Sequence, residues 1–137
     1  YGLVGSEMCI RDRYDSLHIL YAENQLAQLL ERKVIEVVPL AYMRGRTLDS
    51  AYMILDEAQN ATVLQMKMFL TRLGIGSKAI ITGDVTQIDL QNRSDSGLLQ
   101  ASKLLNNVQG IGIVNLGKKD VVRHPLVMKI IEAYDQN

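Results

Sequence analysis

The chain has 137 residues, of which 47% are hydrophobic and 22% charged, and this is the length and composition of one globular domain. Fifteen basic and fifteen acidic residues leave no net charge, so no overall basic field attracts the protein to nucleic acid or to a membrane. The apolar runs fall far short of the roughly 18–20 residues that cross a bilayer, which predicts a soluble protein. The single cysteine excludes an internal disulfide and fits a reducing compartment.

The N-terminal residues have a different character from the rest. Residues 3–12 resemble the translation of a sequencing adapter, so we expect residues 1–13 to be non-native and residues 14–137 to be the protein proper. An ordinary N-terminal segment is the alternative. Without residues 1–13 the charges still balance, but the cysteine is lost and with it the argument about the compartment.

Hydrophobic spacing predicts an alternation of helices and strands along the chain. In chain order, we expect helices at 15–32, 62–73, 96–105 and 125–134, and strands at 34–38, 51–55, 78–82 and 108–116. The clearest signals are the apolar run at 51–55, typical of a buried parallel strand, and the capping-box spacing of Thr62 and Gln65. The pattern predicts an α/β fold, with a mainly parallel sheet between two helical layers.

Ligands of such sheets bind at the carboxyl ends of the strands, and two carboxylate-bearing turns are expected there. Asp56 and Glu57 follow one strand, and Asp84 follows another, with Gln87 within one turn. An aspartate so placed can hold Mg²⁺, and a neighbouring glutamate can polarise an attacking water. A glutamine can sense a γ-phosphate without adding charge. On its own, the Asp-Glu pair fits a helix-capping role equally well.

Taken together, the two motifs resemble the Walker B and third motifs of superfamily 1 helicase-like ATPases. Longer blocks then resemble the PhoH family in order. These blocks are residues 34–37, 39–48, 54–60, 65–72, 81–90, 96–98 and 120–127. The resemblance implies a cytoplasmic bacterial ATPase with a RecA-like P-loop NTPase core, often associated with RNA and often assembled as a homo-oligomeric ring.

The family's motifs imply roles for the matching residues of this chain. Asp56 would bind Mg²⁺ and Glu57 would be the catalytic base. Gln87 would be the γ-phosphate sensor and a candidate catalytic residue, and Asp84 would support its turn. Asp56, Asp84 and Gln87 would thus form the part of the ATP site that this chain carries.

Three arginines are the candidate cationic groups. The resemblance implies that Arg123 is a catalytic arginine finger acting across a subunit interface, and a surface salt bridge with Asp120 is the alternative. Arg44 and Arg46 flank a glycine in the loop 41–50, which suits the phosphates of single-stranded RNA or of the nucleotide. A solvated, charged loop is the alternative for this pair.

The glycine-rich loop that holds nucleotide phosphates, Gly-x-x-x-x-Gly-Lys-Ser/Thr, is not found. The near miss at 112–119 has Lys119 where a hydroxyl is needed. We therefore expect the carboxyl-terminal part of a PhoH-like ATPase domain, incomplete at its N-terminus and inactive alone. Two other hypotheses stay open. One is a Mg²⁺-dependent nuclease or phosphatase that uses Asp56, Glu57 and Asp84, and the other is a non-catalytic assembly or RNA-binding module.

Overall fold

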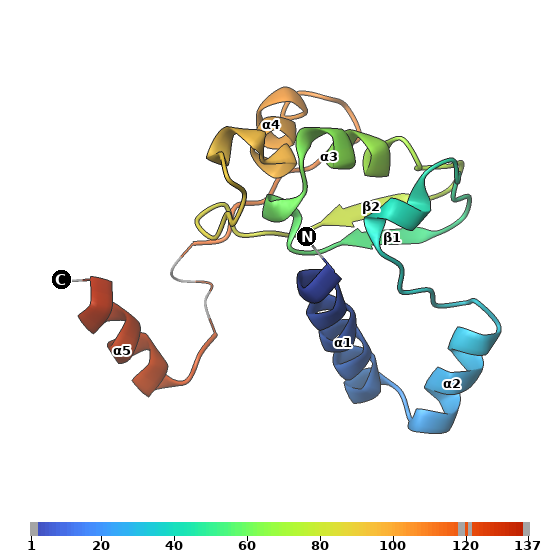
Figure 1. Ribbon diagram of the computed structural model, residues 1–137, viewed down its shortest axis with the longest axis horizontal. Helices are drawn as coiled ribbons and strands as arrows, with labels where there is room; N and C mark the ends of the chain where they lie inside the picture. Colours follow the sequence, from blue (N-terminus) through green and yellow to red (C-terminus); the bar gives the residue numbers. More distant parts are fainter. Residues whose placement is uncertain (1–2, 118–119, 121, 136–137) are drawn as a thin grey trace. The chain divides into compact units, whose positions relative to one another are not determined.

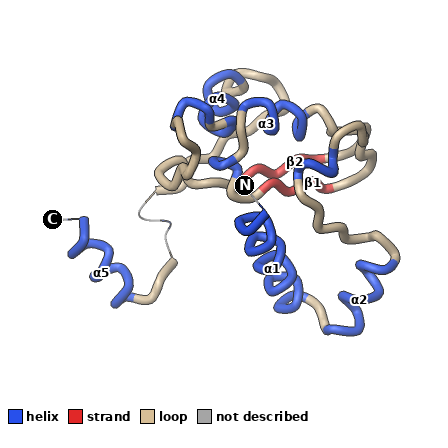
Figure 2. The backbone as a smooth tube through the Cα atoms, in the orientation of Figure 1, coloured by secondary structure: helices blue, strands red, loops and turns tan. Residues whose placement is uncertain are grey.

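The computed structural model of the chain describes residues 3–117, 120 and 122–135. They form two compact units, Tyr1–Ala101 and Ser102–Asn137. The elements, in chain order, are α1 (Leu3–Leu20), α2 (Glu23–Glu31), the 3-10 helix η1 (Leu40–Met43), β1 (Tyr52–Leu55), η2 (Ala58–Asn60), α3 (Val63–Leu70), β2 (Lys78–Ile81), η3 (Arg93–Asp95), α4 (Gly97–Leu104) and α5 (Pro125–Asp135) (Figure 1 and Figure 2).

Strands β1 and β2 form a parallel pair, with Tyr52 opposite Lys78 and Leu55 opposite Ile81. Helix α3 makes the crossover between them, which parallel neighbours require. Backbone hydrogen bonds continue the pairing beyond both ends of the two strands. At the carboxyl ends, Thr82 N–H donates to Leu55 O over 2.9 Å. The alternation of strand, helix and parallel strand confirms the predicted α/β class.

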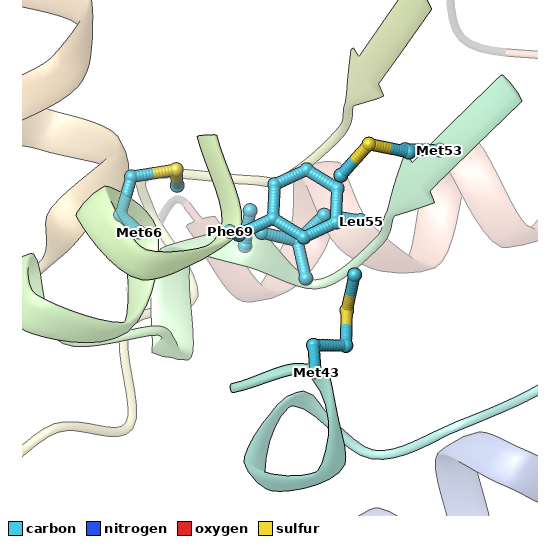
Figure 3. Packing of buried hydrophobic residues seen from close by; sticks show 6 residues of the cluster. Met43, Met53, Leu55, Met66 and Phe69 are labelled. Carbon is cyan, nitrogen blue, oxygen red and sulfur yellow. The ribbon is translucent and has the colours of Figure 1, made fainter. Parts of the chain in front are cut away.

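The hydrophobic core lies on the face of the sheet that α3 covers. Met53 and Leu55 point from β1 toward α3, where Phe69 is 2% exposed, and Met43 closes the cluster from η1 (Figure 3). Strand residues alternate between the two faces, so Tyr52 and its neighbours point the other way. The large apolar side chains exposed on that opposite face are Tyr52, Ile54 and Ile80. The described residues thus supply a sheet and one helical layer.

Four predicted elements agree closely with the structure. Strands β1 and β2 and helices α4 and α5 begin and end within one residue of the expected positions. Helix α3 also forms as expected, although it ends at Leu70, three residues before the predicted end. Its capping box is complete, because Thr62 N–H donates to Oε1 of Gln65 and Gln65 N–H donates to Oγ1 of Thr62. These two bonds pair backbone donors that the first turn of a helix leaves free.

The single helix predicted at 15–32 is wrong. Two helices, α1 and α2, occupy this part of the chain and are separated at Ala22, whose backbone is extended. Leu26 of α2 is 1% exposed, and α2 contacts α1. Helix α1 also runs across the boundary expected between residues 13 and 14, and the foreign origin of residues 1–13 stays a prediction.

The strands predicted at 34–38 and 108–116 are wrong as well. The backbone N–H groups of Val34 and Ile35 both donate to Leu29 O and so complete the end of α2 instead of a sheet ladder. In the second segment, Ile111 N–H donates to Val108 O in a tight turn. β-Branched runs become strands only where a neighbouring strand takes up their backbone groups. Within the described ranges, no helix is both long and apolar enough to cross a membrane.

Candidate functional site

The carboxyl ends of β1 and β2 lie side by side because the strands are parallel and Leu55 lies opposite Ile81. Asp56 follows β1 and Thr82 follows β2, and the Thr82 hydroxyl donates a hydrogen bond to Oδ1 of Asp56. Thr82 O accepts a second bond, from Ala58 N–H, over 3.0 Å. The two turns that carry the candidate residues are therefore joined directly after the strands.

The carboxylate of Asp56 has one oxygen bonded within its turn and one in an ion pair. Its Oδ1 accepts Glu57 N–H over 2.9 Å, while its Oδ2 lies 2.6 Å from Nη1 of Arg13, a residue of the segment expected to be non-native. Mg²⁺ commonly binds one or two protein carboxylates and completes its octahedron with water and substrate phosphates, so this single carboxylate fits such a site. In the part of the chain that the structure describes, no group of three or more acidic, histidine or cysteine side chains could hold a metal. Asp56, Glu57 and Asp84 thus do not meet as a group of three metal-binding side chains in this structure, which is evidence against the nuclease hypothesis and leaves its experimental test to be made.

Glu57 has an unusual backbone conformation for its residue type. Its φ of 54° and ψ of 35° lie in the left-handed region, at the N-cap of η2. A non-glycine residue there costs about 1–2 kcal/mol, and such residues concentrate at functional sites. The side chain is held as well, because Oε2 of Glu57 accepts Nε2 of Gln59 over 2.6 Å. Backbone and side chain together define one position for this carboxylate.

Gln59 is a site residue to which the sequence analysis gave no role. It is 1% exposed, and its Oε1 accepts Asp84 N–H over 3.1 Å while its Nε2 donates to Glu57. Its backbone oxygen accepts the Ser96 hydroxyl over 2.8 Å. A Cβ on Gly83 would lie 2.7 Å from Oε1 of Gln59, so only glycine leaves room for this amide. The sequence offered one indication of a role for Gln59, which is its place at the end of the Asp-Glu-Ala-Gln motif.

The turn after β2 is organised by the carboxylate of Asp84. Its Oδ1 accepts the N–H and the hydroxyl of Thr86, over 2.8 Å and 2.6 Å, and its Oδ2 accepts Nε2 of Gln87 over 3.0 Å. Oδ1 of Asn60 accepts Asp89 N–H over 2.8 Å and ties this loop back to the one after β1. The structure thus brings Asp56, Glu57, Asp84 and Gln87 together at one end of the sheet.

Arg44 and Arg46 are not part of this group. Arg46 pairs with Glu36, with Nη2 and Oε1 3.2 Å apart, and Arg44 is exposed on the same loop. That loop leads into the amino end of β1, whereas the acidic turns follow the carboxyl ends. Arg123 is exposed in the unit Ser102–Asn137. The salt bridge suggested for it is not among the ion pairs of the described residues, and Oδ2 of Asp120 instead accepts Gly117 N–H over 2.7 Å.

Comparisons with known proteins place these residues in a family context. A family model described as PhoH-like protein matches residues 6–135. A PhoH-like protein of Bacillus subtilis is 61% identical over 127 residues, which are 93% of this chain and 40% of the relative. A PhoH-like protein of Synechocystis is 53% identical over 93% of this chain and 39% of the relative, and Protein PhoH of Escherichia coli K12 is 50% identical over 73% and 28%. The chain therefore spans about 40% of the length of the first two relatives.

Proposed function

The chain belongs to the PhoH-like protein family, and on that premise we propose that it is part of a longer, cytoplasmic protein that hydrolyses ATP. The supporting observation is the pair of joined turns at the carboxyl ends of β1 and β2. In open α/β sheets this edge is where ligands bind. The proposal includes a RecA-like P-loop core, whose glycine-rich phosphate loop belongs to the remainder of the longer protein.

The proposed roles follow from the chemistry of each side chain. Asp56 would hold Mg²⁺ through Oδ2, and the ion would supply positive charge against the phosphate oxygens. Glu57 would orient the attacking water and accept its proton, because it directly follows Asp56 in the chain and Gln59 holds its carboxylate. Gln87 would contact the γ-phosphate as a neutral donor from the turn that Asp84 holds.

The proposal also gives roles to the three candidate arginines. Arg123 is exposed, as a finger acting across the subunit interface of a ring would have to be. Arg44 and Arg46 would bind the phosphates of single-stranded RNA. Arg46 would have to exchange Glu36 for a phosphate, which is feasible because exposed ion pairs contribute at most about 1 kcal/mol.

The test is phosphate release by the full-length protein with ATP and Mg²⁺. Glu57→Gln keeps the shape of the side chain but removes the base, so kcat should fall about 10²- to 10⁴-fold while ATP still binds. Glu31→Gln makes the same chemical change at an exposed position at the end of α2 and should leave kcat unchanged. Loss of turnover after chelation of the metal is also expected.

Two results would overturn the proposal in favour of the other hypotheses. RNA cleavage that requires Mg²⁺ but not ATP, and that is lost in Asp84→Asn, would indicate the nuclease. RNA binding that is equal in the wild type and in Glu57→Gln, with no ATP turnover in either, would indicate the non-catalytic module.

A further inference from the structure

We propose that Gln59 is a positioning residue that fixes the Glu57 carboxylate relative to the turn of Asp84 and Gln87. The inference rests on the proposed ATPase function, because it concerns the distance between the base and the γ-phosphate sensor. Glu57 belongs to the segment after β1 and Gln87 to the segment after β2. One buried amide contacts both segments.

The nitrogen and the oxygen of the Gln59 amide contact different partners. Nε2 of Gln59 donates to Oε2 of Glu57 over 2.6 Å, and Oε1 accepts Asp84 N–H over 3.1 Å. Only one orientation of the amide satisfies both partners, because Glu57 offers an acceptor and the backbone of Asp84 offers a donor. Asp84 in turn holds Gln87 through its own carboxylate, so a short chain of hydrogen bonds runs from Glu57 to Gln87.

Glutamine is the residue type that this position requires. A glutamate would place a second acceptor and a second negative charge against Glu57, and an asparagine would be one methylene too short to reach both partners. The side chain is 1% exposed, so water does not compete for either contact. In this burial Gln59 differs from the exposed polar residues of the neighbouring loops.

The surroundings hold the amide in place from two directions. The Ser96 hydroxyl donates to the backbone oxygen of Gln59 over 2.8 Å and anchors the residue from the segment before α4. Gly83 lies against the amide, where an added Cβ would approach Oε1 to 2.7 Å and the backbone nitrogen of Gln59 to 3.0 Å. The amide is thus enclosed between the two turns and has little room to shift.

The expected kinetic effect is on the chemical step. Gln59 does not reach solvent, so its loss should leave the KM for ATP within about twofold of the wild type. A misplacement of about 1 Å between reacting groups can lower the rate about 100-fold, and we expect kcat to fall about 10- to 100-fold. A residue needed only for folding would lower the yield of folded protein without this split between kcat and KM.

The experiment uses the full-length protein with three variants. Gln59→Met keeps the length of the side chain and removes both contacts. Gln59→Glu keeps an oxygen for Asp84 N–H but removes the donor to Glu57. Gln65→Met is the matched control, because Gln65 is an exposed glutamine whose side chain makes the capping bond of α3. Both Gln59 variants should lose kcat, and the control should keep it.

Amide hydrogen exchange gives a second readout that does not depend on turnover. The N–H of Asp84 donates to Gln59, so exchange in a peptide covering residues 83–87 should be faster in Gln59→Met and near the wild-type rate in Gln59→Glu. Residues 78–81 of β2 should stay protected in both variants, and this protection also shows that the variants are folded.

The outcomes separate the two proposals. An inactive wild type overturns the ATPase proposal, and exchange at Asp84 then decides whether Gln59 holds the turn. An active wild type with an equally active Gln59→Met overturns the positioning role and leaves the ATPase proposal standing. Unchanged exchange at residues 83–87 in Gln59→Met overturns the positioning role as well.

Discussion

The left-handed backbone at Glu57 leads to a prediction about the order of stability of two variants. Glycine normally destabilises a regular element by about 0.5–1 kcal/mol relative to alanine. At a φ of 54° the order should reverse, because alanine keeps the steric cost of the left-handed region and glycine does not. We therefore expect Glu57→Gly to be more stable than Glu57→Ala.

The size of the difference follows from terms that do not cancel. Both variants lose the hydrogen bond from Nε2 of Gln59, so this loss drops out of the comparison. Glycine avoids the steric cost of the left-handed region, which is about 1–2 kcal/mol, but it keeps its usual entropic disadvantage. The difference leaves Glu57→Gly about 1 kcal/mol more stable than Glu57→Ala. With a urea dependence of about 1–3 kcal/mol per molar, this is a difference of roughly 0.3–1 M between the unfolding midpoints.

Urea unfolding of the two variants measures this difference directly, and Lys67 provides the control. Lys67 is exposed in the middle of α3, where alanine should be more stable than glycine by about 1 kcal/mol. A reversed order at Glu57 with the usual order at Lys67 supports the argument. An alanine variant at position 57 that is as stable as the glycine variant, or more stable, would refute it.

Three further predictions concern packing and capping, each measured by the free energy of unfolding. Phe69→Ala should lose about 3–5 kcal/mol because Phe69 is 2% exposed in the core, and a loss below 1 kcal/mol would contradict that packing. Gly97→Ala should lose about 1–3 kcal/mol, since the new Cβ would approach Thr62 O to 2.6 Å and press on Met66, and a neutral result would mean that α3 and α4 are farther apart. Thr62→Ala should lose about 1 kcal/mol by removing the acceptor for Gln65 N–H, and an equal loss in Thr62→Ser would argue against the cap.

The elements that the sequence predicts correctly depend on local chemistry. The capping box of α3 needs only residues four apart or closer, and both of its bonds form. The start of α5 is similar, because Nδ1 of the neighbouring His124 accepts Leu126 N–H over 3.2 Å. Strand β1 has no charged residue and β2 is apolar after Lys78, and the two strands pair in parallel with α3 as the crossover between them.

The elements that are predicted wrongly from the sequence depend on partners elsewhere in the chain. Val34 and Ile35 have high strand propensity, yet their N–H groups bond to Leu29 O at the end of α2. Propensity describes the residue, whereas a strand also requires a second strand beside it. No local pattern reports whether that second strand exists.

In the candidate site, too, local features are predicted from the sequence and long-range contacts are not. The positions of Asp56 and Asp84 after two strands follow from the apolar runs before them. The bond between Gln59 and Asp84 joins residues 25 positions apart, and periodicity carries no information about such a contact. The catalytic roles of these residues stay predictions, and so do those of the three arginines.

The core of this chain is rich in sulfur, and this has a chemical consequence. Met43, Met53 and Met66 are each at most 6% exposed and surround Phe69. Peroxide converts a thioether into a polar sulfoxide, and close packing keeps the reagent away from these three sulfur atoms. Each transient opening of the core exposes them, and a sulfoxide formed then no longer fits an apolar site on reclosure. The extent of oxidation at Met43, Met53 and Met66 therefore records how often the core has opened.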